Sequence, residues 1–143
     1  MSSAIPPEVD RIFRSAPFVA DLGLRLESVG NGECTSVLTL GPRHLQQDGF
    51  VHAGVQATVA DHTAGGAAAT LLRGEGQYVL SAGFQINLLR AAKGERLVCR
   101  ARVLKAGSQL TVVESEVFCA ASGTERLVSK ATVTLAVVSR REG

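Results

Sequence analysis

The chain has 143 residues, of which 45% are hydrophobic and 20% charged, and its 15 Lys and Arg against 13 Asp and Glu give a net charge of +2. This balance excludes a nucleic-acid binder that relies on a strong overall field, and five Phe, one Tyr and no Trp are too few for a base-stacking platform. We expect one domain over residues 1–143, which is long enough to bury a hydrophobic core.

The cysteines and the chain start bear on the compartment. Cys34, Cys99 and Cys119 are odd in number and widely spaced, which favours buried thiols in a reducing compartment over disulfides. The first residues are rich in proline and acidic residues, so no secretory signal is predicted. The sequence also contains no run of 18 apolar residues, the length that a membrane-spanning helix needs. We therefore expect a cytoplasmic protein with neither a membrane nor a nucleic acid as its partner.

The first elements are predicted to be a short helix and a hairpin. The helix, over residues 6–16, has prolines and acidic residues in its first turn and apolar residues three and four positions apart. Extended runs follow over residues 22–29 and 33–40. Between them, Asn31 and Gly32 tolerate positive φ angles, so a tight hairpin is expected.

The segment from His44 to Leu72 is the one around which the rest is organised. It begins with polar, turn-prone residues and continues as a long run of small and apolar residues without proline, which predicts a buried helix over about 52–73. One carboxylate, Asp61, lies in its middle. Because a charged group in an apolar helix is costly, Asp61 either lies at a solvent-facing edge, pairs with a distant Arg, or has a function.

The start of this helix is predicted to present unpaired backbone N–H groups. Gly49, Ala53 and Gly54 keep side-chain bulk away from the first turn, where these donors and the helix dipole can hold an anion or polarise a carbonyl group. At about 1.5 Å of rise per residue, Asp61 lies about 12 Å further along. If the two act together, the carboxylate must come from a second subunit.

The remaining chain is predicted to form strands over residues 77–89, 95–105, 110–120 and 127–138, connected by tight turns. Such short links join antiparallel neighbours, so we expect one curved antiparallel sheet with the long helix on its concave face, an α+β fold.

Alternation assigns side chains to the two faces of these strands. In the first, Tyr78, Leu80 and Phe84 are predicted on one face and Ser81 on the other. In the next two, a tight hairpin would set the acidic pair opposite the basic pair, with Glu114 and Glu116 facing Arg102 and Arg100.

Several of these residues fall in a pattern that resembles a known family. The run His44-Leu45-Gln46, Gly49, His52-Ala53-Gly54, Ala60-Asp61 is similar to H-x-N-x-x-G-x-x-H-G-G followed by L-A-D in hotdog-fold acyl-CoA thioesterases of the 4-hydroxybenzoyl-CoA thioesterase-like superfamily. It most resembles the phenylacetate-pathway (PaaI-type) branch. Residues 84–95 are similar to that family's strand ending in R-P-A-x-x-G, and the resemblance spans about residues 22–138. It implies a hotdog fold.

The resemblance also implies an activity and a role for each matched residue. The chain would hydrolyse a small aromatic or short- to medium-chain acyl-CoA to the free acid and coenzyme A. Asp61 would act as nucleophile or general base, and the Ala53 N–H would stabilise the oxyanion. Gln46 would hold the water or the leaving sulfur, His52 would order the helix-entrance loop, and Ser81 would assist the water.

The implied substrate-binding residues are Gly54, Arg90 and Lys93; the two cations either grip coenzyme A phosphates or form a solvated rim. The resemblance implies no metal or redox cofactor, with coenzyme A present as part of the substrate. The histidine spacings of eight and ten residues likewise match no usual metal-ligand pair. In the family each site is built from two subunits, so a homodimer is the expected minimum unit and a homotetramer the expected assembly.

Gln46, Ala53 and Ala91 depart from the Asn, Gly and Pro of the family pattern, which bears on turnover and substrate choice more than on fold. Two alternative functions remain open. A non-catalytic acyl-CoA-binding hotdog domain would keep the pocket and lose the chemistry, but Asp61 argues against it. A hotdog dehydratase would place an Asp and a His together at the helix start, whereas here the Asp comes nine residues after His52.

Overall fold

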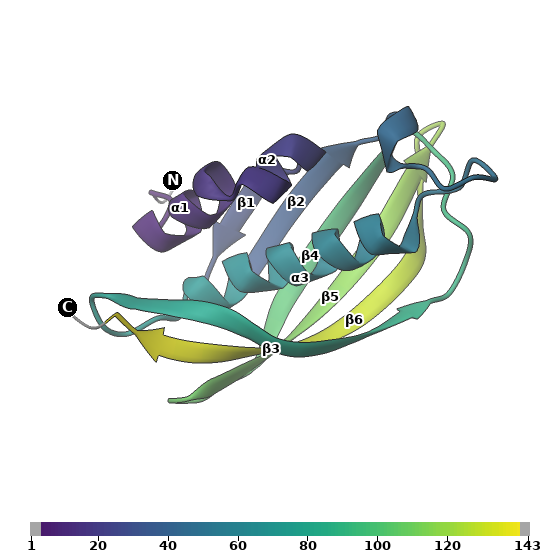
Figure 1. Cartoon of the computed structure of the whole chain (residues 1–143). Coiled ribbons are helices and arrows are strands. Elements are labelled where there is room, and N and C mark those ends of the chain that lie inside the picture. Colours follow the sequence, from purple (N-terminus) through teal and green to yellow (C-terminus); the bar gives the residue numbers. More distant parts are fainter. Residues whose placement is uncertain (1–3, 141–143) are drawn as a thin grey trace.

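A computed structural model describes residues 4–140; residues 1–3 and 141–143, the ends of the predicted domain, lie outside the described residues. Its helices and strands, labelled in Figure 1, are α1 (Pro7–Ser15), α2 (Pro17–Leu22), β1 (Arg25–Gly30), β2 (Glu33–Thr39), α3 (Ala53–Ala69), β3 (Gln77–Leu88), β4 (Arg96–Ala106), β5 (Leu110–Ala121) and β6 (Thr124–Ser139). A 3-10 turn, η1 (Pro42–His44), follows β2.

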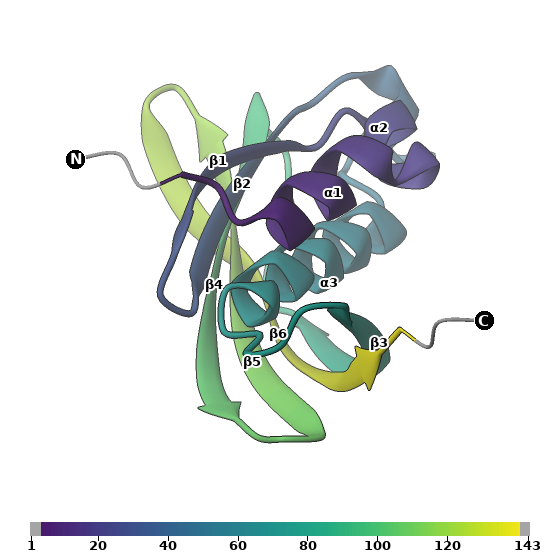
Figure 2. The ribbon, with the colours of Figure 1, turned by 90° about the vertical axis from the view of Figure 1, so that its left-hand side faces the viewer.

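The strands form one antiparallel sheet in the order β1-β2-β4-β5-β6-β3, and the sheet curves around α3 (Figure 1). In Figure 2, which looks nearly along α3, the helix lies on the concave side with α1 and α2 on its flank. This is the hotdog arrangement, so the predicted α+β fold is confirmed. Within residues 4–140, every helix falls short of the length and hydropathy that a bilayer-spanning segment requires.

The two predicted helices differ from the observed ones at their ends. The first helix stops at Ser15, Ala16 is extended, and the chain resumes as α2 at Pro17, because a residue before proline disfavours helical geometry while proline suits a new first turn. The central helix ends at Ala69, earlier than predicted. The N–H groups of the next three residues donate to carbonyl groups three positions back, so this part of the chain has the hydrogen bonds of a 3-10 turn and not those of an α-helix.

Local turn chemistry and cross-strand pairing follow the predictions. Asn31 and Gly32 have φ angles of 50° and 80° and form the two-residue turn of the β1–β2 hairpin. Across β4 and β5, Arg102 pairs with Glu114 and Arg100 with Glu116, as expected. The ion pairs are more varied, because Arg102 contacts Glu114 at 3.6 Å while Arg100 turns to Glu125 at 3.1 Å.

The predicted alternation along β3 is confirmed from Tyr78 to Ser81 and is wrong beyond Ser81, because a bulge at Ala82 shifts the register. Ser81 pairs with Leu135, and Phe84 pairs with Val133, both of which are buried under α3. Ser81 and Phe84 therefore share the helix-facing side, and Tyr78 and Leu80 lie on the outer face.

The prediction that tight turns connect all the later strands is also wrong. The β3 strand pairs with β6 and not with the next strand along the chain, so residues 89–95 cross the end of the sheet to reach β4. As a result, β3 is an edge strand with one hydrogen-bonded neighbour within residues 4–140.

The core forms where the small residues of α3 approach the sheet. Residues 63–69 of the helix are all buried, and a Cβ atom added at Gly66 would lie 2.7 Å from Cys34 Sγ and 3.1 Å from Phe13 Cε2. The three cysteines are free and buried, as predicted, and burial raises the pKa of Cys34 and Cys99 to about 12. These thiols are therefore unreactive at neutral pH.

We predict that Gly66→Ala lowers the free energy of unfolding by about 1–3 kcal/mol, because the added methyl group overpacks the contact with Cys34. Gly65→Ala is the matched control, since its nearest neighbours lie at 3.8 and 3.9 Å. It should change stability by no more than about 1 kcal/mol, toward stabilisation. Urea denaturation at fixed protein concentration measures both. Equal effects of the two substitutions would contradict this view of the packing.

Candidate active site

The entrance of α3 is built by His52 and Ala53. His52 is the N-cap residue, with its Nδ1 accepting a hydrogen bond from the Gly54 N–H at 2.8 Å and its carbonyl accepting from Val55 and Gln56. Ala53 is the first helical residue, where no intrahelical acceptor exists. Within residues 4–140, its N–H has no hydrogen-bond partner, and the residue is exposed. A polarising donor is thus available at the predicted position.

Gly54, predicted to bind substrate, has a different local role. Its N–H is already used by the cap, and a Cβ atom there would lie 3.0 Å from His52 Nδ1. The absence of a side chain lets the His52 ring approach the backbone. Gly54 therefore supports the entrance through His52, and its own N–H is not free for a ligand.

The loop before α3 is held by two polar side chains. His44 is buried, with Nδ1 accepting from the Gly41 N–H at 3.0 Å and Nε2 lying 2.8 Å from the Leu22 carbonyl oxygen, to which it donates. The Oε1 of Gln46 accepts from the backbone N–H groups of Asp48 and Phe50 at 2.5 and 3.2 Å. His44 is therefore a structural residue, and Gln46 has only its NH2 group left for a ligand.

Asp61 and Ser81 are brought together, although they lie on different elements. The Ser81 hydroxyl donates to Asp61 Oδ1 at 2.5 Å. Ser81 faces α3 because it pairs with Leu135, a buried residue on the helix-facing side of β6. Asp61 is half-buried and forms no ion pair within the described residues. The carboxylate thus keeps its second oxygen for other partners.

A continuous stripe on α3 connects the helix entrance to this carboxylate. Gly54, Ala57, Thr58 and Asp61 recur at intervals of three and four residues, and none of them is buried. The eight residues from Ala53 to Asp61 correspond to about 12 Å along the axis. One chain therefore does not bring the Ala53 N–H and the Asp61 carboxylate to the same reacting atom.

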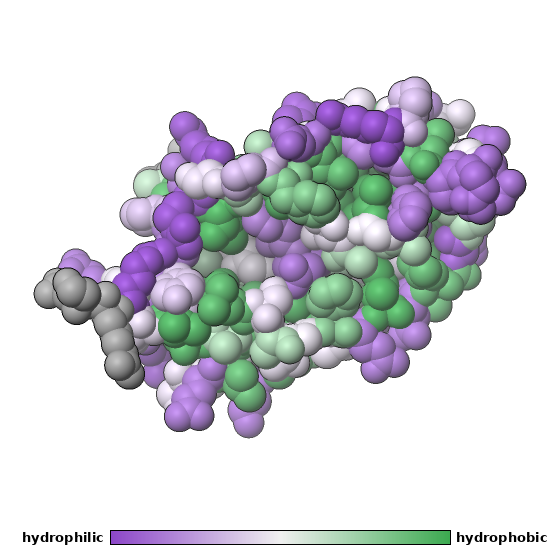
Figure 3. All heavy atoms as spheres, in the orientation of Figure 1, coloured by the Kyte–Doolittle hydropathy of each residue, from purple (hydrophilic) through white to green (hydrophobic). Residues whose placement is uncertain are grey.

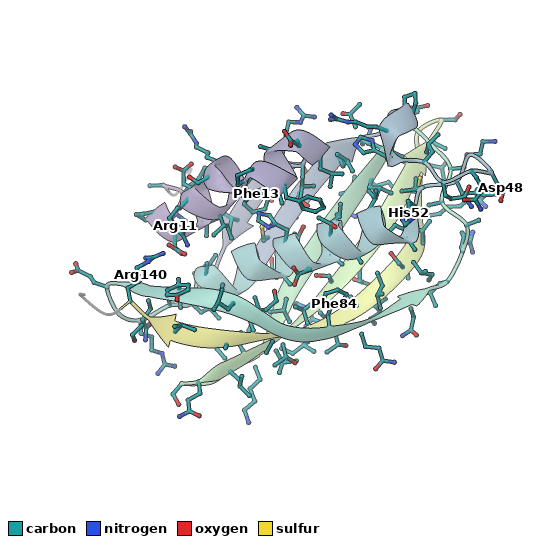
Figure 4. The ribbon with its side chains drawn as sticks, viewed as in Figure 1. Arg11, Phe13, Asp48, His52, Phe84 and Arg140 are labelled. Carbon is teal, nitrogen blue, oxygen red and sulfur yellow. The ribbon has the colours of Figure 1, made fainter. Side chains whose placement is uncertain are left out.

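A groove of about 540 Å³ lies against the helix entrance. Three segments line it, namely the loop before α3, the first turn of α3 and the chain after β3: Gln46, Phe50, His52, Ala53, Gln56 and residues 88–92. His52 stands at the start of α3, beside the loop that carries Asp48 (Figure 4). We call this space the entrance groove.

A second cavity, of about 550 Å³, adjoins the entrance groove and shares Arg90 and Ala91 with it. Arg90, Lys93 and Arg126 line this basic cavity, and within residues 4–140 none of the three forms an ion pair. Sequence reasoning missed Arg126, together with Thr124. The signal was the Ser122-Gly123 turn, because a hairpin there folds the start of β6 back beside the end of β5.

Comparison with known proteins assigns the chain to a family. The sequence profile of the thioesterase superfamily matches residues 48–125. A thioesterase family protein from Silicibacter pomeroyi is 34% identical, with a TM-score of 0.90 over 93% of this chain and 97% of its own. The chain belongs to the thioesterase superfamily.

Two further solved structures are similar. A conserved protein from Pseudomonas aeruginosa is 28% identical, with a TM-score of 0.77 over 86% of this chain and 94% of its own. A thioesterase from Haemophilus influenzae, 20% identical, shares the fold with a TM-score of 0.83 over 99% of this chain and 95% of its own. No curated protein matches the sequence.

We predict that His52→Ala lowers the free energy of unfolding by about 0.5–2 kcal/mol, because the Gly54 N–H loses its capping acceptor. His52→Asn should recover most of this loss, since Asn is a favoured N-cap residue. Thermal and urea unfolding of the three proteins measure the difference. Equal stability of His52→Ala and the unaltered protein would show that the cap contributes nothing.

Proposed function

We propose that this protein hydrolyses acyl-CoA thioesters to the free acid and coenzyme A, as a member of the phenylacetate-pathway (PaaI-type) branch. The observation that carries the proposal is the unpaired Ala53 N–H at the edge of a groove that continues into a cavity lined by three cations. A thioester carbonyl at Ala53 would have its acyl group in the entrance groove. The phosphates of its coenzyme A would then reach the basic cavity.

The Ala53 N–H would stabilise the negative charge that develops on the carbonyl oxygen during attack. A backbone donor at a helix start is fixed before the reaction and needs no reorganisation, and such donors contribute roughly 3–4 kcal/mol in well-studied enzymes. Ala in place of Gly is compatible with this role. Ala53 lies inside the α-helix, where φ is negative and its methyl group is not strained.

Asp61 would supply the carboxylate. In the general-base form, it takes a proton from water as the water oxygen bonds to the thioester carbon. The C–S bond then breaks, and the departing thiolate takes the proton that Asp61 accepted from the water. In the nucleophilic form, the carboxylate itself attacks the thioester carbon, the C–S bond breaks and the thiolate leaves, which gives a mixed anhydride. Water then hydrolyses this anhydride to the free acid and restores the Asp61 carboxylate. Ser81 serves either form by fixing one carboxylate oxygen and leaving the other free to act.

We propose that each site combines the helix entrance of one chain with Asp61 of a second copy. The stripe on α3, whose residues are half-buried or exposed in this chain, supports this arrangement. If two copies pack their stripes antiparallel about a two-fold axis near Ala57 and Thr58, Gly54 of each lies across from Asp61 of the other. The same operation produces two equivalent sites.

The free edge of β3 supports the same dimer. Among the described residues the strand has one neighbouring strand, and an unpaired edge of twelve residues favours pairing with another strand. Phe84 and Leu88 are 49% and 51% exposed. Hydrophobic side chains gather along β3 beneath α3 in Figure 3, and Phe84 lies between the two ribbons in Figure 4. A second copy would cover this surface, and two such dimers would form the proposed homotetramer.

We predict that Asp61→Asn lowers kcat by about 10²–10⁴-fold while the affinity for acyl-CoA and the oligomer size persist, because the amide neither takes a proton nor attacks. Ser81→Ala should cost less, about tenfold, since it removes one hydrogen bond to a carboxylate that remains. Thiol release from a panel of aromatic and straight-chain acyl-CoAs measures both. Unaltered protein that binds acyl-CoA without hydrolysing it would favour the non-catalytic binding domain instead.

We predict that Arg126→Ala raises KM for acyl-CoA by about tenfold, because charge-assisted contacts to the phosphates are lost. KM for the matching N-acetylcysteamine thioester, which has no phosphate, should not change. Arg102→Ala is the control, since Arg102 lies on the outer face of β4 against Glu114. Equal effects on both thioesters would remove Arg126 from phosphate binding.

A further inference from the structure

Gln56 is a buried polar residue at the floor of the entrance groove. It lies on the first turn of α3, is 3% exposed and lines the groove. Its Nε2 makes a long hydrogen bond, 3.5 Å, to the Val51 carbonyl oxygen. Because a carbonyl only accepts, this contact fixes which end of the side-chain amide is the NH2 group and which is the oxygen.

The Oε1 atom of Gln56 has no hydrogen-bond partner within the described residues. Buried polar atoms in folded proteins are nearly always paired, so this acceptor calls for a donor that the chain does not provide. The Ser129 hydroxyl is likewise buried without a partner. Ser129 pairs with Leu88, which lines the same groove. Ser129 itself does not line the groove, so Gln56 supplies the unsatisfied acceptor among the lining residues.

The position of Gln56 limits where a ligand's donor would lie. It follows Ala53 by three residues, so both are on one face of α3, separated by about 4.5 Å of helical rise. Helical side chains lean toward the N-terminus, and the contact with Val51 places the Gln56 amide there. Its Oε1 is therefore about level with the N–H that would hold the carbonyl. A donor that reaches it must be a few bonds from that carbonyl.

We propose that Gln56 is a specificity-determining residue that selects acyl groups with a hydroxyl on the second or third carbon, that is, 2- or 3-hydroxyacyl thioesters. The hydroxyl would donate to Oε1 while the carbonyl accepts from the Ala53 N–H. This inference rests on the proposed function. An unsubstituted alkyl or phenyl group has no donor to offer and would leave the buried oxygen unpaired. The missing hydrogen bond would therefore lower kcat/KM for the unsubstituted chain.

The test compares matched substrates. Values of kcat/KM are measured for butyryl-CoA and its 2- and 3-hydroxy derivatives, and again for the octanoyl series. We expect the protein to prefer one hydroxy position over the unsubstituted chain by roughly 10- to 100-fold. Gln56→Met, nearly equal in size without the acceptor, should bring this ratio close to one, and Gln56→Leu provides a second apolar replacement. Gln109→Met makes the same chemical change in the exposed β4–β5 turn and should leave the ratio as it was.

Two results would overturn the proposal while leaving the proposed function in place. In the first, the unaltered protein hydrolyses hydroxylated and unsubstituted chains equally well. In the second, Gln56→Met slows all substrates by one common factor, which would assign Gln56 to the water or to the pantetheine arm. Failure to hydrolyse any acyl-CoA would instead overturn the proposed function and this inference together.

Discussion

The geometry of α3 determines how the proposed active site can be assembled. The Ala53 N–H and the Asp61 carboxylate are eight residues apart on α3, about 12 Å along a rigid rod, whereas a reacting carbonyl needs both within hydrogen-bond reach. No side-chain rotation closes that gap. The uncovered stripe from Gly54 to Asp61 and the free edge of β3 are the features a second copy would use to supply the missing half.

The polar contacts around α3 fix the helix entrance and the Asp61 carboxylate separately. His52 caps the helix, and His44 and Gln46 hold the preceding loop, so the entrance is a fixed set of backbone donors. Ser81 fixes the carboxylate at the other end of the stripe. The positive charges are also separated by location. Arg90, Lys93 and Arg126 line the basic cavity and form no ion pair within the described residues, whereas on the outer face of the sheet Arg102 pairs with Glu114. Binding and chemistry thus occupy neighbouring parts of one surface.

Features set by local chemistry could be predicted from the sequence, and features set by non-local register could not. The Asn31-Gly32 turn, the Arg102–Glu114 pairing and the long helix follow from φ preferences and alternation over short windows. Phe84 was wrongly predicted on the face opposite Ser81, because the bulge at Ala82 arises from pairing with β6, about fifty residues away in the sequence. Arg126 and Gln56 were missed because their surroundings come from three separate segments.

The most direct measurement mixes two inactive proteins. Asp61→Asn lacks the carboxylate, and Ala53→Pro lacks the donor; proline suits this first helical position, where the preceding His52 is already extended. After subunit exchange, about half of the dimers are mixed and each has one intact site, so about a quarter of full activity should return. Exchange verified by mass spectrometry with no recovered activity would contradict a site shared between two chains.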